Sequence, residues 1–588
     1  MIRTGSSGFS ASTIRRSKTA STLPAPITPG PRDGPWSMAP GWRHPRRNPS
    51  GSPARGRGGR HPPLCGQMGA GPKGGPLMDR IMTGVIESAV TGGDMPAAVR
   101  LAPGILEREG RPAGYLTLVT ALLRAGRGTE AASYGRVLRE LFPADAGIAF
   151  LLGQALHQDG RLAEAIAQWT AALDLAPAMT DACRNVAMGL IDAGRETEAA
   201  DYLDRLLAQC PDDATAWIQL GNIAFRQDRA DAAGDYYRRA LAAAPDRIEA
   251  AINLAETERW LGDADRAEGH LKDALRRDPG SFAAHFNLAG LLLEQGRWRD
   301  GFAHFEWRTN LKTIPPLLAG LPDWRPDTPA GARVALWNDQ GLGDAILFLR
   351  YAGQVKARGH ETVAILQKPL VRLFSTHPAL DRVVAIDEPL EVRPDVQVPF
   401  ASLPHRLIDA DPETSWPGPL LAVPPARRDP GARTRPVGLV WAANAANRQG
   451  LRRNVPLETL APLAGLPGLA WHSLQLGPAA ADLGRSSWRG RMTDHSAGLG
   501  DLYDTAALVA SLDLVITVDT VVAHVAGALG KPVWILLPRP ADWKWRREGE
   551  TSCWYPSARL FRQPRPGDWE GVVSLLAAAL RQGPGQGR

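Results

Sequence analysis

The chain has little cysteine and no apolar run of membrane length. Its four cysteines, Cys65, Cys183, Cys210 and Cys553, are scattered without a CxxC pair, which argues against a disulfide framework and against a zinc site. No stretch of about eighteen uninterrupted apolar residues occurs, so we expect no transmembrane segment. These absences together predict a cytoplasmic protein without a structural metal.

Acidic residues are almost absent from the first 77 positions, where twelve Lys and Arg face one acid, Asp33. This segment carries a net charge of +11 within a total of +7, so residues 78–588 carry −4. A pI near 9.4 would ordinarily suggest nucleic acid as a partner. Because the positive charge is confined to the segment, we expect no nucleic-acid partner.

Residues 1–77 are rich in Pro, Gly, Ser and Arg and contain almost no aliphatic clusters. Such a composition cannot bury enough apolar surface to fold, so we expect a disordered tail. A transit peptide is a second interpretation, although the prolines oppose an amphipathic helix. A third interpretation, slightly favoured, is that translation starts at Met78, where the first patterned stretch "MDRIMTGVIESAV" begins.

A 34-residue period runs through the next part of the chain. Prolines recur with this spacing, and so do small or turn-forming residues half-way between them: Pro143, Pro177, Pro211, Pro245, Pro279; Gly126, Gly160, Gly194, Asp228, Gly262, Gly296. This pattern resembles the tetratricopeptide repeat, a helix pair whose stacked copies form a solenoid. We expect six to seven repeats within residues 78–311. Their groove either binds a protein or peptide, or the repeats only support the rest of the chain.

The last copy departs from the repeat pattern. In "GFAHFEWRTNL", Arg308 stands where a small residue is expected. The departure predicts a capping helix that packs against the following domain.

The second half alternates short β-rich runs with helical ones, as parallel α/β folds do. A Pro- and Arg-rich linker divides it into an N-terminal lobe, residues 330–423, and a C-terminal lobe, residues 436–582. The expected strands are "RVALW", "ETVAIL", "RVVAI" and "DVQVPF" in the first lobe, and "VGLVWA", "LAWHSLQL", "LDLVITV" and "PVWILL" in the second. Two such lobes form a cleft at the carboxyl ends of their strands, where ligands of these folds bind.

The stretch "NDQGLGDAILFLRY" after the first strand combines a glycine loop with a helix start, which is typical of phosphate binding. It is not a dinucleotide fingerprint, because Ile346 stands at the third glycine position. The chain also lacks the GxxxxGK[ST] loop of ATPases. A structural turn therefore remains an alternative to a phosphate loop.

A second candidate is "LDLVITVDTVVAHVAGALGKPVWILL", in which a buried strand is followed by Asp519, Thr520 and a helix. Free N–H groups and the dipole at the helix start favour a diphosphate there, with the Thr520 hydroxyl as a further donor. His524 lies one turn into the helix. It either faces the same ligand or packs between helices.

These two stretches resemble the heptosyltransferase-like glycosyltransferases, family nine, which adopt the two-lobed GT-B fold. The whole chain resembles bacterial proteins in which tetratricopeptide repeats precede such a domain, a layout similar to that of protein O-GlcNAc transferases of another family. The resemblance implies an α-solenoid followed by a GT-B domain of two Rossmann-like lobes. It also implies sugar transfer from a nucleotide diphosphate donor, with inversion, without a metal and without a cofactor.

The resemblance assigns roles residue by residue. Asp344 matches the general base that removes a proton from the acceptor hydroxyl, although a helix cap for a helix beginning at Ala345 is the alternative. Cations are needed to stabilise the departing diphosphate, and the loop after "VGLVWA" supplies them. The expected substrate-binding residues are Gly341, Gly343, Arg448, Arg452, Asp519, Thr520 and His524. Arg453 is the third arginine of the same loop.

One departure from the family pattern concerns the nucleotide side. The family commonly has Gly, Asn and Pro after the tryptophan of this strand type, where the chain has Ala443, Asn444 and Ala445. Two hypotheses therefore follow. The chain is a transferase whose repeats recruit a protein or glycan acceptor, or it is an inactive repeat scaffold that mediates protein–protein interaction.

Overall fold

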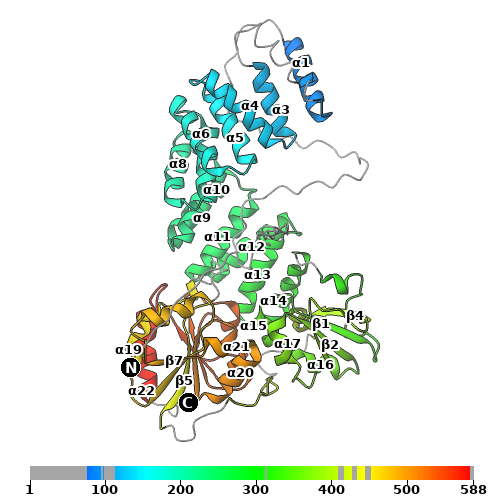
Figure 1. Cartoon of the computed structure of the whole chain (residues 1–588), viewed down its shortest axis with the longest axis vertical. Helices are drawn as coiled ribbons and strands as arrows, with labels where there is room; N and C mark the ends of the chain where they lie inside the picture. The colour runs from blue at the N-terminus through cyan, green and yellow to red at the C-terminus, as the bar shows by residue number, and fades with distance from the viewer. Residues whose placement is uncertain are drawn as a thin grey trace, which may run out of the picture.

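The computed structural model describes residues 76–94, 97–98, 113–311, 314–407, 416–426, 433–443 and 452–582. Figure 1 shows a curved array of helices that leads into two α/β lobes. Residues 1–75 of the expected tail and Arg448 lie outside the described residues. No helix in these ranges is long and apolar enough to cross a membrane.

The helical array consists of antiparallel pairs that stack in chain order. Its helices are α1 Pro76–Thr91, α3 Ala113–Arg124, α4 Gly128–Leu141, α5 Ala146–Gln158, α6 Leu162–Leu175, α7 Thr180–Asp192, α8 Glu196–Gln209, α9 Ala214–Arg226, α10 Ala230–Ala243, α11 Ile248–Leu261, α12 Ala264–Arg277, α13 Phe282–Glu294 and α14 Trp298–Phe305. A 3-10 turn, η1 Glu306–Leu311, ends the array. Each helix buries one face against its neighbours, and the shared cores run on from pair to pair.

The 34-residue period reflects two geometric needs. At every mid-repeat turn from Gly126 to Gly296 the residue has a positive φ, +60° at Asp228 and between +73° and +102° at the glycines. Glycine adopts this conformation without the steric cost of a side chain. Gly153 meets the second need, because a Cβ there would lie 2.4 Å from the Trp169 ring. The repeat residues are therefore fixed by turn geometry and close helix contact.

The last helix pair joins the α/β half through a common core. Phe302 and Phe305 of α14 lie 6.1 and 6.0 Å, ring to ring, from Trp543 in the C-terminal lobe. Arg308 is buried and donates to Asp339 at 2.8 Å and to Ser402 at 2.8 Å, both in the N-terminal lobe. The capping element predicted from the departure at Arg308 is thus confirmed.

The N-terminal lobe contains a parallel sheet with the order β3-β2-β1-β4. Its elements are β1 Arg333–Trp337, α15 Leu342–Phe348, α16 Ala352–Lys356, β2 Glu361–Leu366, α17 Lys368–Phe374, β3 Arg382–Ala385, β4 Val396–Pro399 and α18 Leu403–Arg406. The 3-10 turns η2 Pro316–Leu318, η3 Leu349–Tyr351 and η4 Phe400–Ser402 connect them. All four expected strands are present within one residue of the stretches quoted above.

The C-terminal lobe has a six-stranded parallel sheet with the order β10-β9-β8-β5-β6-β7. Its elements are β5 Arg435–Val440, α19 Ala461–Ala464, β6 Leu469–Ser473, β7 Met492–Asp494, α20 Leu502–Ser511, β8 Leu514–Val518, α21 Val521–Ala528, β9 Val533–Leu537, β10 Ala558–Arg562 and α22 Trp569–Gln582. Short 3-10 turns lie between them: η6 Leu457–Leu460, η7 Pro478–Arg485, η8 Ser496–Gly498 and η9 Trp543–Trp545. Counted along the chain this order is 3-2-1-4-5-6, that of nucleotide-binding doubly wound sheets.

Some elements differ from the expectation. β7, β10 and α22 were not among the expected strands and helices. The helix predicted to begin at Ala345 begins at Leu342, with Gly341 as its N-cap. Its start is set by the Gly341 backbone, and Asp344 is the third helical residue, not the residue before the helix.

Candidate functional site

Each sheet has a point where the chain's winding direction reverses, between β1 and β4 in one lobe and between β5 and β8 in the other. Loops at the carboxyl ends of such strands form the ligand crevice in open α/β sheets. The loop after β1 leads into α15, and the loop after β8 leads into α21. These two helices pack against each other, as Figure 1 shows. The structure therefore brings the two candidate stretches together across the lobe interface.

Gly343 and His524 are in close contact across this interface. A Cβ on Gly343 would lie 2.5 Å from Cδ2 of His524, so only a glycine fits without a shift. His524 is buried and is hydrogen-bonded through Nδ1 to the Tyr555 hydroxyl at 3.0 Å. Burial, with the nearby charge of Lys544, lowers the pKa of His524 to about 4. The ring is therefore neutral at pH 7 and fills the interface.

Asp344 both caps α15 and reaches the other lobe. Its Oδ2 accepts from the backbone N–H of Gly341 at 3.1 Å, and its Oδ1 lies 3.1 Å from Nζ of Lys544. The side chain keeps 22% of its surface exposed. A helix-capping role for Asp344 therefore does not exclude a role at the lobe interface, because one carboxylate oxygen makes the cap and the other faces the second lobe.

Lys544 belongs to a chain of alternating charges that leads from Asp344 of the N-terminal lobe into the C-terminal lobe. Its Nζ lies 3.0 Å from Asp542, whose carboxylate lies 3.8 Å from Arg453. Arg453 in turn lies 3.1 Å from Asp519 at the start of the α21 loop. The chain therefore joins Asp344 of one lobe to Asp519 of the other.

The charges stabilise one another in this buried setting. Burial lowers the pKa of Lys544, but the carboxylates of Asp344 and Asp542 outweigh it and hold that pKa above its ordinary value. Burial raises the pKa of Asp542, and the charges of Lys544 and Arg453 more than reverse this. The carboxylate of Asp519 raises the pKa of Arg453. Lys544, Asp542 and Arg453 therefore carry charge at pH 7.

The remaining predicted residues lie at the edges of this site. Thr520 is the N-cap of α21, and its hydroxyl lies 3.0 Å from that of Thr517 without capping the helix. Gly341 is exposed at the start of α15. Among the described residues no group of three or more His, Cys, Asp and Glu side chains could hold a metal ion.

Arg452 points away from α21 and toward the solenoid. Its guanidinium donates to the carbonyl of Phe225 at 3.1 Å, lies 2.9 Å from Asp228 and stacks over Trp260, 4.5 Å from the ring centre. The residue expected to bind a diphosphate thus docks a repeat. The neighbouring Arg453, whose side chain points the other way, is the loop arginine that reaches Asp519.

Arginines of the C-terminal lobe meet three consecutive repeat turns. Arg452 binds at Asp228, Arg547 donates to the carbonyl of Arg259 at 2.7 Å beside Gly262, and the Arg546 guanidinium lies beside Gly296. Each turn follows the carboxyl end of a helix, α9, α11 or α13, where unpaired carbonyls and the helix dipole attract cations. The repeat turns therefore also serve as the docking surface for the lobe.

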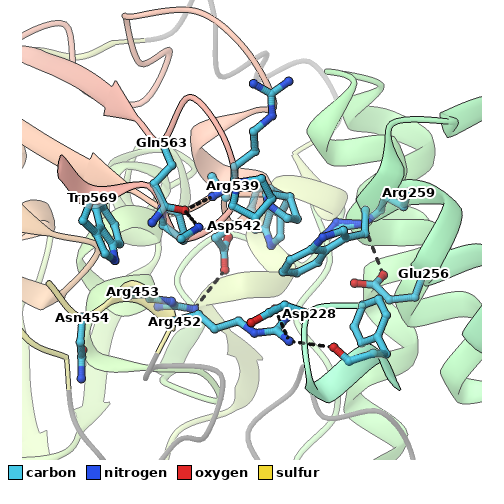
Figure 2. A pocket seen from close by; sticks show the side chains of 18 residues that line it. Asp228, Glu256, Arg259, Arg452, Arg453, Asn454, Arg539, Asp542, Gln563 and Trp569 are labelled. Carbon is cyan, nitrogen blue, oxygen red and sulfur yellow. Dashed lines mark hydrogen bonds and ion pairs between the residues drawn. The ribbon is translucent and has the colours of Figure 1, made fainter. Parts of the chain in front are cut away.

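A cavity of about 290 Å³ lies between the solenoid and this lobe (Figure 2). Repeat residues form one wall, and loops after β5, β9 and β10 form the other. Arg453 and Asp542 of the charge chain lie on the cavity wall. The charge chain therefore reaches from the lobe interface to the wall of the cavity.

Three members of the charge chain were not among the residues chosen from the sequence. Lys544 and Asp542 lie in "PADWKWRREG", which follows β9 and matches no motif, and Arg453 was passed over in favour of its neighbours. Only their place in the fold could have indicated Lys544 and Asp542. The loop after β9 lies at the same edge of the sheet as the loop after β8, where Asp519 is found.

Comparison with family models settles the nature of the helical array. Models of the tetratricopeptide repeat match residues 116–180, 187–248 and 261–301. The array is a tetratricopeptide-repeat solenoid. These matches lie within the helical array, and the structure defines the two α/β lobes that follow as parallel sheets.

The chain is 28% identical over 335 residues to Protein FlbA of Caulobacter vibrioides, an alignment that covers 50% of this chain and 54% of that protein. The chain thus spans about half the length of this curated relative. Among solved structures, it is similar to MamA at 20% identity, covering 28% of this chain and 90% of that one, with a TM-score of 0.26. The Cut9–Hcn1 structure is 17% identical, with coverage of 40% of this chain and 46% of that chain and a TM-score of 0.31. YrrB is 18% identical, with coverage of 31% of this chain and 93% of that chain and a TM-score of 0.27. Likenesses of this size carry no argument about function.

Proposed function

We propose that the chain is a glycosyltransferase with a GT-B catalytic half, which moves a sugar from a nucleotide diphosphate donor to a protein or glycan acceptor recruited by the repeats. One observation carries the proposal. The helices that follow the winding reversals of the two parallel sheets pack against each other, and a carboxylate of one lobe is joined through a chain of charges to the helix N-terminus of the other. This is the arrangement that a group transfer between two substrates needs.

The donor diphosphate would bind at the N-terminus of α21. Free backbone N–H groups and the helix dipole favour an anion there, and the Thr520 hydroxyl can donate to it. Arg453 brings a cation to this point, because it lies 3.1 Å from Asp519. Its guanidinium has five N–H donors, so it can bind Asp519 and a phosphate oxygen together and stabilise the leaving diphosphate.

Asp344 would act as the general base toward the acceptor hydroxyl. Its two oxygens offer about four acceptor positions, of which the Gly341 N–H and Lys544 occupy two. The exposed part of the carboxylate is available to an acceptor hydroxyl, whose proton it would take as the hydroxyl attacks; inversion is what the family resemblance implies.

A repeat scaffold without activity is the second candidate. The observation in its favour is the burial of Asp519 and His524, each 3% exposed, which closes the lobe interface around residues that the resemblance assigns to the donor. In a scaffold the solenoid would bind a protein partner, and the lobes would serve only as a docked support.

Nucleotide binding separates the two candidates. Calorimetric titration of the full chain with UDP, GDP, ADP and their sugars should detect one preferred nucleotide. Arg453→Gln and Thr520→Ala should each weaken its binding by about 1.5–3 kcal/mol, the value of a hydrogen bond to a charged group. Arg372→Gln is the matched control, since that arginine pairs with Asp504 between the lobes but does not line the cavity. Absence of binding to every ligand would favour the scaffold.

A further inference from the structure

The cavity between the solenoid and the C-terminal lobe has two walls of different origin. The solenoid contributes Phe225, Asp228, Glu256, Arg259 and Trp260. The lobe contributes the loops that follow β5, β9 and β10, lying at 452–454, 538–543 and 563–569. Figure 2 shows side chains of both parts around this space, so a ligand there would contact the repeats and the α/β half together.

The cavity continues from the donor site. Arg453 and Asp542 line it, and Arg453 also binds Asp519 beside the N-terminus of α21. A ligand whose anionic group lies at that N-terminus would direct its other end past Arg453. The space open to that end is the cavity.

The walls match a planar heteroaromatic group with polar edges. Trp260 and Phe225 on one side and Trp569 on the other offer aromatic faces, and the amide of Gln563 and the carboxyl of Glu256 offer hydrogen-bonding groups. A volume of about 290 Å³ is near the lower end for small-molecule pockets, about 300 to 1,000 Å³. It suits a nucleoside and is too small for a folded peptide segment.

The solenoid wall is held in a fixed position. Arg547 bonds the carbonyl of Arg259, and Arg452 bonds Asp228 and covers one face of Trp260. Trp260 also contacts Phe225 edge to face, with 5.3 Å between ring centres. The aromatic wall is therefore preorganised by the same contacts that dock the repeats.

We infer that the tetratricopeptide repeats complete the nucleotide site, with the nucleoside of the donor lying in this cavity against Trp260. The inference rests on the proposed function for the position of the diphosphate. It makes the solenoid part of the donor site as well as a surface for acceptors, so that the docking of the repeats and the binding of nucleotide depend on each other.

Two ligands and the variant Trp260→Ala, with three further variants for comparison, test this. The preferred nucleoside diphosphate and inorganic pyrophosphate are titrated against the full chain and against Trp260→Ala. Loss of base stacking should weaken the nucleoside diphosphate by about tenfold or more and leave pyrophosphate affinity unchanged. Arg453→Gln should weaken both ligands.

Trp217→Ala is the matched control. Trp217 lies in α9 and is stacked by an arginine, Arg239 at 4.9 Å, just as Trp260 is by Arg452 at 4.5 Å, but it does not line the cavity. It should bind both ligands like the parent. Trp260→Phe, which keeps an aromatic face, should recover most of the affinity and so distinguish loss of stacking from misfolding.

The outcomes against the inference are distinct from those against the proposed function. If Trp260→Ala binds the nucleoside diphosphate as the parent does, while Arg453→Gln weakens it, the nucleoside lies elsewhere and the inference is overturned alone. Equal losses for nucleoside diphosphate and pyrophosphate in Trp260→Ala would also overturn it. If the parent binds neither ligand, the proposed function fails and the inference falls with it.

Discussion

Replacement of Lys544 by methionine tests the charge chain between the lobes. Lys544 is 10% exposed and lies 3.1 Å from Asp344 and 3.0 Å from Asp542. Methionine fills much of the space of the lysine stem but leaves both carboxylates without this partner. Removal of one member of a buried ion pair typically costs about 3–5 kcal/mol.

The expected loss lies near the lower end of that range. Asp344 is 22% exposed and can be hydrated, and Asp542 keeps Arg453 at 3.8 Å and the backbone N–H of residue 544 at 3.2 Å. A loss of about 3 kcal/mol corresponds to a fall in Tm of about 6–12 °C for a unit of this size. Unfolding can be followed by tryptophan fluorescence, because Trp543, Trp545 and Trp554 lie in the shared core.

The pH dependence gives the prediction a sign. The pKa of Asp542 is lowered in the folded chain, so its contribution is present above its unfolded pKa of about 3.9 and is lost as the pH falls through the folded value. The difference between parent and variant should therefore be large at pH 7 and shrink toward pH 3. Lys368→Met, which removes an exposed pair with Asp387, is the control and should change little. A Tm for Lys544→Met within about 1 °C of the parent at pH 7, or a gap that widens in acid, would refute the reasoning.

Two further predictions concern the docking surface and the lobe interface. Gly262→Ala should destabilise the chain more than Gly160→Ala. Both changes impose about 1–2 kcal/mol of left-handed backbone strain, but only at Gly262 would the new Cβ also displace the Arg547 guanidinium, 2.8 Å away. Thermal melting and limited proteolysis of the two variants check this, and equal effects would contradict it. The pKa of His524 is lowered to about 4 in the folded chain from an unfolded value near 6.5, so protonation of the unfolded state should reduce the free energy of unfolding by about 3 kcal/mol as the pH falls from 6.5 to 4. In His524→Gln this part of the pH dependence should disappear. Urea-unfolding curves of the parent that do not change across this pH range would argue against a buried neutral ring.

The solenoid could be predicted closely from the sequence, because its signals are local. A turn that needs a positive φ at Gly160 and a contact that admits no side chain at Gly153 are each determined by neighbours within half a repeat. The strands of the lobes other than β7 and β10 were also predictable as buried apolar runs. β10, "ARLFR", was not, because two arginines interrupt its apolar pattern.

The site was predictable only in part, since it is assembled by tertiary contacts. The resemblance drew attention to Asp344 and Asp519, and the structure connects them through Lys544 and Asp542 from a loop without a motif. Arg452 and Arg453 are adjacent in the chain, yet one binds a repeat and the other binds Asp519. Sequence spacing cannot decide which way each side chain points, because the docked solenoid determines it.

Glycosyl transfer by the parent chain and by Asp344→Asn tests the central claim most directly. Each is incubated with labelled nucleotide sugars and a cell extract as the acceptor mixture, and both transferred label and released nucleoside diphosphate are measured. Asparagine can still accept the Gly341 N–H but cannot take a proton, so transfer should fall by about 10²- to 10⁴-fold while nucleotide affinity stays within a few-fold of the parent. Near-parental transfer by Asp344→Asn would contradict the role of Asp344, and a parent chain that binds and consumes no nucleotide sugar would contradict the transferase itself.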